Sequence, residues 1–149
     1  MIGTRHPRRR QVLRWSALAC LVLASCNAHP RAPAGPAVAV TLRDFSIRTS
    51  TATVQAGHVR FDVHNSGPAT HEFIVVRTNL PADRLPIASD GLTVNEDALQ
   101  GVGEISHVDI WNTRSLDLDL APGRYVFFCN LEGHYLGGMH GVIEVTPDG

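Results

Sequence analysis

The chain has 149 residues, which suits a single domain, and its formal net charge of −1 hides an uneven distribution of charge. All thirteen basic residues are arginines, and five of them lie within residues 1–14. The other eight stand against fourteen acids, a net charge of about −6 beyond residue 25. Nucleic-acid binding is therefore excluded, because no basic patch is left to neutralise phosphates.

The N-terminus has the organisation of an export signal. Residues 1–14 are basic and carry no acid, WSALACLVLA (15–24) is an apolar run, and small residues follow it. The run is shorter than the roughly 20 residues that a membrane-spanning helix needs. A buried amphipathic helix is the alternative, but nothing in the run would give it a polar face. We therefore expect residues 1–25 to be a signal.

Two short motifs in this signal resemble known export motifs. RRRQVLR (8–14) resembles the twin-arginine motif, although an arginine-rich start is also common in ordinary signals, so both export routes stay open. LASC (23–26) resembles the lipobox of bacterial lipoproteins, in which the cysteine becomes the lipidated first residue. The resemblance implies a lipid anchor on Cys26 and a protein held at a membrane, in the periplasm or another extracytoplasmic compartment.

The rest of the chain reads as a tether followed by a β domain. NAHPRAPAGPA (27–37) is rich in Pro and Ala, so we expect residues 26–37 to be a flexible tether and 38–149 to be one domain. Short alternating or β-branched runs follow, separated by Gly and Pro turns, and they predict an all-β sandwich or barrel. The strands are expected over 38–47, 58–65, 71–78, 115–120, 124–129 and 140–146.

One long stretch departs from this rhythm. Residues 79–110 are polar and weakly patterned, and we expect an insertion between core strands with one short helical turn near 95–100. Long connections are often functional, and a solvated decorative loop is the equal alternative. The stretch holds six acids: Asp83, Asp90, Glu96, Asp97, Glu104 and Asp109.

The segment FFCNLEGHYLGGMHG (127–141) carries the chemistry. It holds Cys129, His134 and Met139, with four residues between each neighbouring pair. Thiolate, imidazole and thioether ligands select copper or zinc over calcium or magnesium. Cys129 has no disulfide partner in the expected domain, since Cys20 lies in the signal and Cys26 at the lipid site.

One loop cannot surround an ion, so a further ligand is expected from another strand. The glycines at 133, 137 and 138 allow the loop to turn tightly between two strands. The candidate for the remaining ligand is His71, which opens the strand HEFIVV after the turn NSGPAT (65–70).

Together FCNLEGHYLGGMHGVIEV and NSGPATHEF strongly resemble the copper-ligand segments of the cupredoxins, with the loop spacing of the rusticyanin and auracyanin groups. The resemblance covers 38–149 except 79–110, and it implies a Greek-key β-sandwich that holds one copper. It implies a trigonal plane of His71, Cys129 and His134 with Met139 as a weak axial ligand. It also implies one-electron transfer between membrane or periplasmic redox partners such as a cytochrome or an oxidase, without enzymatic turnover.

Further expectations follow from the resemblance. An edge of His134 should reach the surface, with Leu131 and Leu136 forming an apolar docking patch around it. Glu72 stands where many cupredoxins have Asn, but its backbone N–H can still bond to the cysteine sulfur. Glu132 replaces a common Pro, which predicts a less rigid loop.

Other functions remain as alternatives. A copper-binding or copper-delivery lipoprotein would use the same ligands without shuttling electrons. A copper enzyme is disfavoured because the chain lacks a trinuclear histidine cluster and the second cysteine of a dinuclear loop. A redox sensor built on Cys129 would leave Met139 without a role. The remaining histidines of the domain are not expected to bind this metal, and they are His58, His64, His107 and His140. A weak second metal site at His107 is a minor alternative.

Overall fold

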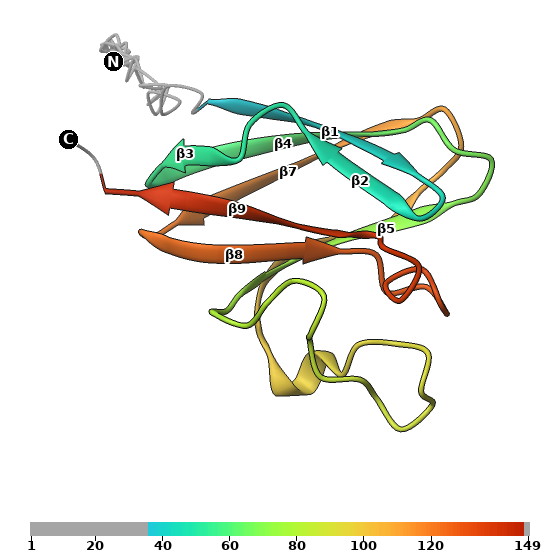
Figure 1. Cartoon of the computed structure of the whole chain (residues 1–149). Coiled ribbons are helices and arrows are strands. Elements are labelled where there is room, and N and C mark those ends of the chain that lie inside the picture. Colours follow the sequence, from blue (N-terminus) through green and yellow to red (C-terminus); the bar gives the residue numbers. More distant parts are fainter. Residues whose placement is uncertain (1–35, 148–149) are drawn as a thin grey trace, which may run out of the picture. The chain divides into compact units, whose positions relative to one another are not determined.

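The computed structural model describes residues 36–147, and within them two β-sheets lie face to face (Figure 1). The first sheet has the strand order β2-β1-β4-β7, and the second has the order β3-β9-β8-β5-β6. This architecture confirms the expected all-β sandwich. The elements are β1 (Ala37–Arg43), β2 (Ser46–Thr49), β3 (Thr53–Gln55), β4 (Gly57–Asn65), β5 (His71–Arg77), the 3-10 helix η1 (Glu96–Ala98), β6 (Gln100–Val108), β7 (Thr113–Leu120), β8 (Gly123–Phe128) and β9 (His140–Thr146).

Alternating side chains on the strands build the core between the two sheets. On β1 every second residue is buried, and β4 repeats this pattern, as a half-buried strand requires. Three aromatic rings lie at the centre, with Phe73 5.6 Å from Phe61 and 5.7 Å from Phe127 between ring centroids. No helix within residues 36–147 is long and apolar enough to cross a membrane.

A second apolar cluster lies on the outer face of the five-stranded sheet. The segment between β5 and β6 lies on this side of the sheet (Figure 1), and its Leu85 and Val94 pack against side chains of β5 and β8. Because β5 and β8 are buried on both faces, their sequences read as nearly continuous apolar runs. The cluster consists of Ile74, Val76, Leu85, Val94, Val126, Phe128 and Tyr135.

The expected insertion over 79–110 is therefore wrong in its extent. Residues 100–108 form β6, an edge strand that pairs antiparallel with β5. Its sequence QGVGEISHV shows little alternation because only Ile105 and Val108 are buried, and two glycines interrupt the pattern. The irregular part ends before Gln100. It is not a purely solvated loop, since Leu85 and Val94 are buried. The helix η1 confirms the helical turn expected near 95–100.

The single strand expected over 38–47 is also wrong, because the chain reverses inside it. Arg43 pairs with Ser46, so Asp44 and Phe45 form a two-residue turn between β1 and β2. Phe45 has a φ of 59°, a conformation that bulky residues rarely adopt. Phe45 stands where glycine or asparagine would be the usual signal, and Asp44 is the one turn-favouring residue of the pair, so the local signal is weak.

Candidate metal centre

The fold brings His71, Cys129 and His134 together at one end of the sandwich. One ligand atom of each lies within 4.8 Å of the others. His71 is the first residue of β5, Cys129 directly follows β8, and His134 lies in the loop between β8 and β9. His71 and Cys129 have no exposed surface, whereas His134 is half-buried.

Met139 lies at the other end of the same loop. It directly precedes β9 and has no exposed surface, and its carbonyl oxygen accepts a 3.0 Å hydrogen bond from the backbone N–H of Cys129. This bond extends the β8–β9 ladder by one pair beyond Phe128 and His140. The loop from Cys129 to Met139 therefore begins and ends at the same place.

The loop is held in shape by its own backbone. Its internal bonds include those from the N–H of His134 to the carbonyl of Leu131 and from Met139 to His134, at 2.9 and 3.0 Å. Gly133 and Gly138 have φ values of 76° and 109°, which favour glycine. Gly137 is required for a different reason, since a Cβ there would lie 2.1 Å from the ring of Phe45.

Asn65 fixes the turn that delivers His71. Its side chain is fully buried, and its amide nitrogen donates to the carbonyls of Ala69 and Val108 at 2.7 and 2.8 Å. Its Oδ1 accepts from the N–H of Gly67 at 2.9 Å. These three bonds tie the turn over residues 65–70 to the end of β6, so the start of β5 is positioned from both sides.

The imidazole of His71 has the character of a neutral ligand. Burial lowers its pKa, the nearby His134 lowers it further, and Asp44 acts in the opposite direction. Neither ring nitrogen makes a well-aligned hydrogen bond within the described residues, but Nε2 lies 3.2 Å from Oδ1 of Asp44. Nδ1 is thus left without a partner, and a buried nitrogen of this kind is destabilising unless something binds it.

The sulfur of Cys129 lies between a backbone N–H group and an imidazole nitrogen. It accepts a 3.3 Å hydrogen bond from the backbone N–H of Glu72 and lies 3.5 Å from Nδ1 of His134. Burial raises the pKa of the thiol, and the backbone N–H groups of Glu72 and Leu131 oppose this only in part. A bound cation would stabilise the thiolate, so the unpartnered His71 nitrogen and the S,N donor set together fit a soft metal ion such as copper.

The segment between β5 and β6 is fastened to the loop that holds the cluster. The amide nitrogen of Asn130 donates to the carbonyl of Val94 at 3.1 Å, and its Oδ1 accepts from the Val94 N–H at 2.6 Å. The hydroxyl of Tyr135 donates to the carbonyl of Ala82 at 2.9 Å and accepts from the N–H of Leu85 at 2.8 Å. This segment therefore supports the outer side of the loop.

The other histidines of the described residues lie outside the cluster. His58 lies 3.3 Å from both Asp117 and Asp119, and His64 lies 3.0 Å from the hydroxyl of Thr113. Among the described residues the cluster of His71, Cys129 and His134 is the one three-ligand group that could hold a metal ion, so the weak site at His107 gains no support.

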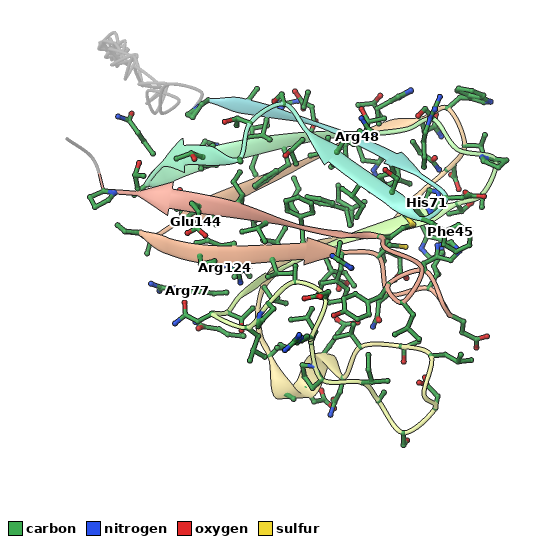
Figure 2. The ribbon with its side chains drawn as sticks, viewed as in Figure 1. Phe45, Arg48, His71, Arg77, Arg124 and Glu144 are labelled. Atoms are coloured by element: carbon green, nitrogen blue, oxygen red, sulfur yellow. The ribbon has the colours of Figure 1, made fainter. Side chains whose placement is uncertain are left out.

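Several contacts of the site were not predicted from the sequence. Phe45, labelled in Figure 2, lies edge-on to His134 with ring centroids 5.8 Å apart and is 57% exposed, and Leu136 is 55% exposed. Leu131, expected at the surface, is instead half-buried against the core. The contacts of Asp44 and Asn130 were missed as well. Only the turn before His71 had a signal in the sequence, because the Asn and Gly of Asn-x-Gly at 65–67 favour turns.

No family model matches the chain. A 27-residue segment is 56% identical to auracyanin-B of Chloroflexus aurantiacus, and this match covers 18% of the chain and 12% of that protein. The chain thus matches about an eighth of the length of this curated relative.

Solved structures match over most of the chain. Reduced auracyanin from Roseiflexus castenholzii aligns with a TM-score of 0.56 and 20% identity, covering 77% of this chain and 100% of that one. Rusticyanin from Thiobacillus ferrooxidans aligns with a TM-score of 0.55 and 18% identity, covering 76% and 79% of the two chains. The described part of the chain therefore has the cupredoxin β-sandwich fold, and its buried His-Cys-His cluster fits a type 1 site and indicates one copper ion per chain.

Proposed function

We propose that the chain is a carrier of single electrons that uses one copper ion held by His71, Cys129, His134 and Met139. The observation that carries this proposal is the cluster of two buried residues and one half-buried residue in which three soft-to-borderline ligand atoms lie within 4.8 Å of one another. Two nitrogens and one sulfur in this arrangement, with a methionine at the end of the same loop, are the donor set of a blue-copper electron-transfer site. Copper supplies a one-electron couple between Cu(I) and Cu(II) when it is bound there.

The chain's own residues would keep the site nearly unchanged during transfer. The β8–β9 loop is closed by the bond between Cys129 and Met139, and the turn before His71 is fixed by Asn65. Because these hydrogen bonds tie the loop and the turn that carry the ligands to the ends of the strands, the ligand atoms have little freedom to follow a change in charge. Small rearrangement of ligands lowers the barrier to electron transfer, which suits a carrier rather than an enzyme that must bind and convert a substrate.

Electrons would leave and enter through His134. It is the one residue of the cluster that is half-buried, the exposed ring of Phe45 packs edge-on against it, and the exposed Leu136 lies two residues further along the loop. An apolar surface around an exposed ligand edge allows close approach by a redox partner, such as a cytochrome or an oxidase. The identity of that partner is part of the proposal.

We also propose that the carrier works outside the cytoplasm at a membrane surface. The proposal rests on the signal-like residues 1–25, the lipobox cysteine Cys26 and the proline-rich tether, which lie almost entirely outside the described residues. A lipid anchor joined to the domain by a flexible tether would let the copper site reach partners within the radius of the tether.

Spectroscopy of the copper-loaded protein tests the proposed function. We expect one copper per chain and an intense blue band that is bleached by a reductant and restored by an oxidant over repeated cycles, with the copper content constant throughout. Loss of copper to a Cu(I) chelator during each reduction, without recovery of the band, would instead identify a copper-delivery protein.

A further inference from the structure

The two-residue turn between β1 and β2 touches both histidines of the metal cluster. Asp44 Oδ1 lies 3.2 Å from Nε2 of His71, and the ring of Phe45 lies edge-on to His134. Figure 2 shows Phe45 and His71 close together at the same end of the sandwich. This turn carries no candidate ligand itself, but its two residues contact two of the candidate ligands.

The position of this turn is fixed, so Asp44 is not a freely moving surface carboxylate. The ring of Phe45 fills the space above Gly137, where a Cβ would approach it to 2.1 Å, and the Phe45 carbonyl lies close to Gly138. The φ of 59° at Phe45 costs about 1–3 kcal/mol for a bulky residue, which is tolerated only where surrounding contacts impose it. The side chain of Asp44 is 37% exposed, so one part of the carboxylate faces water while Oδ1 faces the buried ring.

A glycine leaves room for the contact between the two side chains. A Cβ at Gly67 would lie 3.1 Å from both Asp44 Oδ1 and His71 Nε2, and 3.2 Å from the Cα of Arg43. Gly67 is held in this position by the bond from its N–H to Asn65. The buried Asn65 that delivers His71 therefore also keeps the space beside Nε2 open for the carboxylate.

We propose that Asp44 is a positioning residue for the copper centre: it holds His71 with its proton on Nε2, turns Nδ1 toward the cluster and lowers the reduction potential. This inference rests on the proposed copper site. A carboxylate that faces the outer nitrogen of a ligating imidazole selects the tautomer and raises the basicity of the inner nitrogen. A more basic ligand, with a negative charge behind it, stabilises Cu(II) more than Cu(I), and the potential falls as a result.

The first measurement needs no metal. Long-range nitrogen–proton NMR of the metal-free protein reads which ring nitrogen of His71 carries the proton. We expect the Nε2–H form in the native protein and a mixture of forms in Asp44→Ala, where no acceptor remains. A native His71 with its proton on Nδ1, or a tautomer unchanged in Asp44→Ala, would overturn the positioning role.

The second measurement compares reduction potentials and copper affinities of the loaded proteins. Asp44→Asn keeps the shape and an acceptor oxygen but removes the charge, and we expect Cu(II) to bind about tenfold more weakly, as loss of a supporting residue commonly causes. With Cu(I) affinity unchanged, a tenfold loss corresponds to a potential higher by about 59 mV for a one-electron couple. Asp44→Ala should raise the potential at least as far.

Two further variants separate the local contact from a general effect of charge. Asp119→Asn makes the same change in net charge. Asp119 pairs with His58 on β4, and His58 lies seven residues from Asn65, which is about 23 Å along the strand at 3.3 Å per residue. Its potential should equal that of the native protein. Gly67→Ala keeps every charge but places a methyl group against both Asp44 and His71, so its potential should rise.

The outcomes distinguish this inference from the proposed function. Potentials of Asp44→Asn and Asp44→Ala equal to those of the native protein and Asp119→Asn would overturn the tuning role while leaving a working copper site. A native protein that takes up no copper would overturn the proposed function and the tuning role together, and the tautomer measurement would still decide whether Asp44 orients His71.

Discussion

The backbone N–H of Glu72 donates a 3.3 Å hydrogen bond to the sulfur of Cys129, 57 residues further along the chain. The bond joins the start of β5 to the residue after β8, two strands that lie side by side in the sheet. Since the donor belongs to the main chain, it does not depend on the side chain at position 72, and the expectation that glutamate there permits this bond is confirmed. The carboxyl group of Glu72 accepts from the backbone N–H of Asn130, and burial raises its pKa.

Substitution of the cysteine tests the centre of the proposed site. We expect Cys129→Ser to lose the blue absorption band, because the band arises from charge transfer between a thiolate and Cu(II). The hydroxyl is slightly smaller than the thiol, so the sandwich should remain folded by circular dichroism. A serine variant that stays blue after copper loading would show that Cys129 is not the ligand.

The axial position can be tested without removing a primary ligand. We expect Met139→Leu and Met139→Gln to retain copper, with a higher potential in the leucine variant and a lower one in the glutamine variant. Leucine removes a donor that stabilises the ion, whereas an amide oxygen is a harder ligand that favours Cu(II). Met139 is fully buried, and the leucine swap nearly conserves volume, so it should cost less than about 1.5 kcal/mol of stability. Complete loss of copper from Met139→Leu would instead make the methionine a primary ligand and favour a Cu(I) carrier.

The hydroxyl of Tyr135 should stabilise the segment before β6. In Tyr135→Phe the buried N–H of Leu85 loses its acceptor, which should lower the free energy of unfolding by about 1–3 kcal/mol. Hydrogen exchange at the Leu85 amide should become faster, which chemical denaturation alone would not reveal.

Tyr125→Phe is the matched control for this substitution. Tyr125 is equally buried and donates a 2.8 Å bond to the carbonyl of Ala121, and neither residue belongs to the apolar cluster that this segment covers. Its loss should leave exchange at Leu85 unchanged. Equal exchange at Leu85 in the native protein and Tyr135→Phe would show that the hydroxyl of Tyr135 does not hold the segment.

The candidate ligands of the loop could be identified from the sequence because their chemistry is local. Cys129, His134 and Met139 lie within eleven residues, and their residue types leave few other roles when the spacing is considered as a whole. Strands such as β4 and β7 were predictable for a similar reason, since each alternates apolar and polar residues along one half-buried face.

The contacts around the ligands could not be predicted in the same way. Asp44 and His71 are 27 positions apart and meet only because β1 reverses at a residue with positive φ, which the residue type does not favour. β6 was missed because it is an edge strand with two glycines, and its pairing with β5 depends on that partner rather than on its own pattern. Both features are properties of the assembled sandwich.

The membrane anchor remains a prediction that concerns residues outside the described range. We expect Cys26→Ser to appear in the soluble exported fraction with its copper site intact, because the tether separates the lipid site from the domain. Membrane fractionation and mass spectrometry of the native N-terminus would test this. A serine variant that still sediments with membranes would identify the apolar run at 15–24 as the anchor.

The acids near the loop from Cys129 to Met139, the copper loop, should steer a basic partner. The structure divides the acidic residues of 83–119 into two groups. Asp117 and Asp119 lie on β7 opposite Arg60 and His58, toward the end of β4 that is remote from Asn65 and the metal cluster. The segment that carries Asp83 and Asp97 is instead bonded to the copper loop through Tyr135 and Asn130. Steering toward the copper site should therefore depend on this second group.

Stopped-flow reduction by a cytochrome with a lysine-rich face tests this division. We expect the bimolecular rate of the native protein to fall as salt rises, because the Debye length drops from about 10 Å at 0.1 M to about 3 Å at 1 M. Asp83→Asn with Asp97→Asn should flatten this dependence, whereas Asp117→Asn with Asp119→Asn changes the net charge equally and should not. The transfer rate within the complex should stay constant in all three proteins, since the apolar surface of Phe45 and Leu136 is untouched. A native rate that does not vary with ionic strength would remove these acids from any docking role and leave the segment before β6 with only its structural contacts to the copper loop.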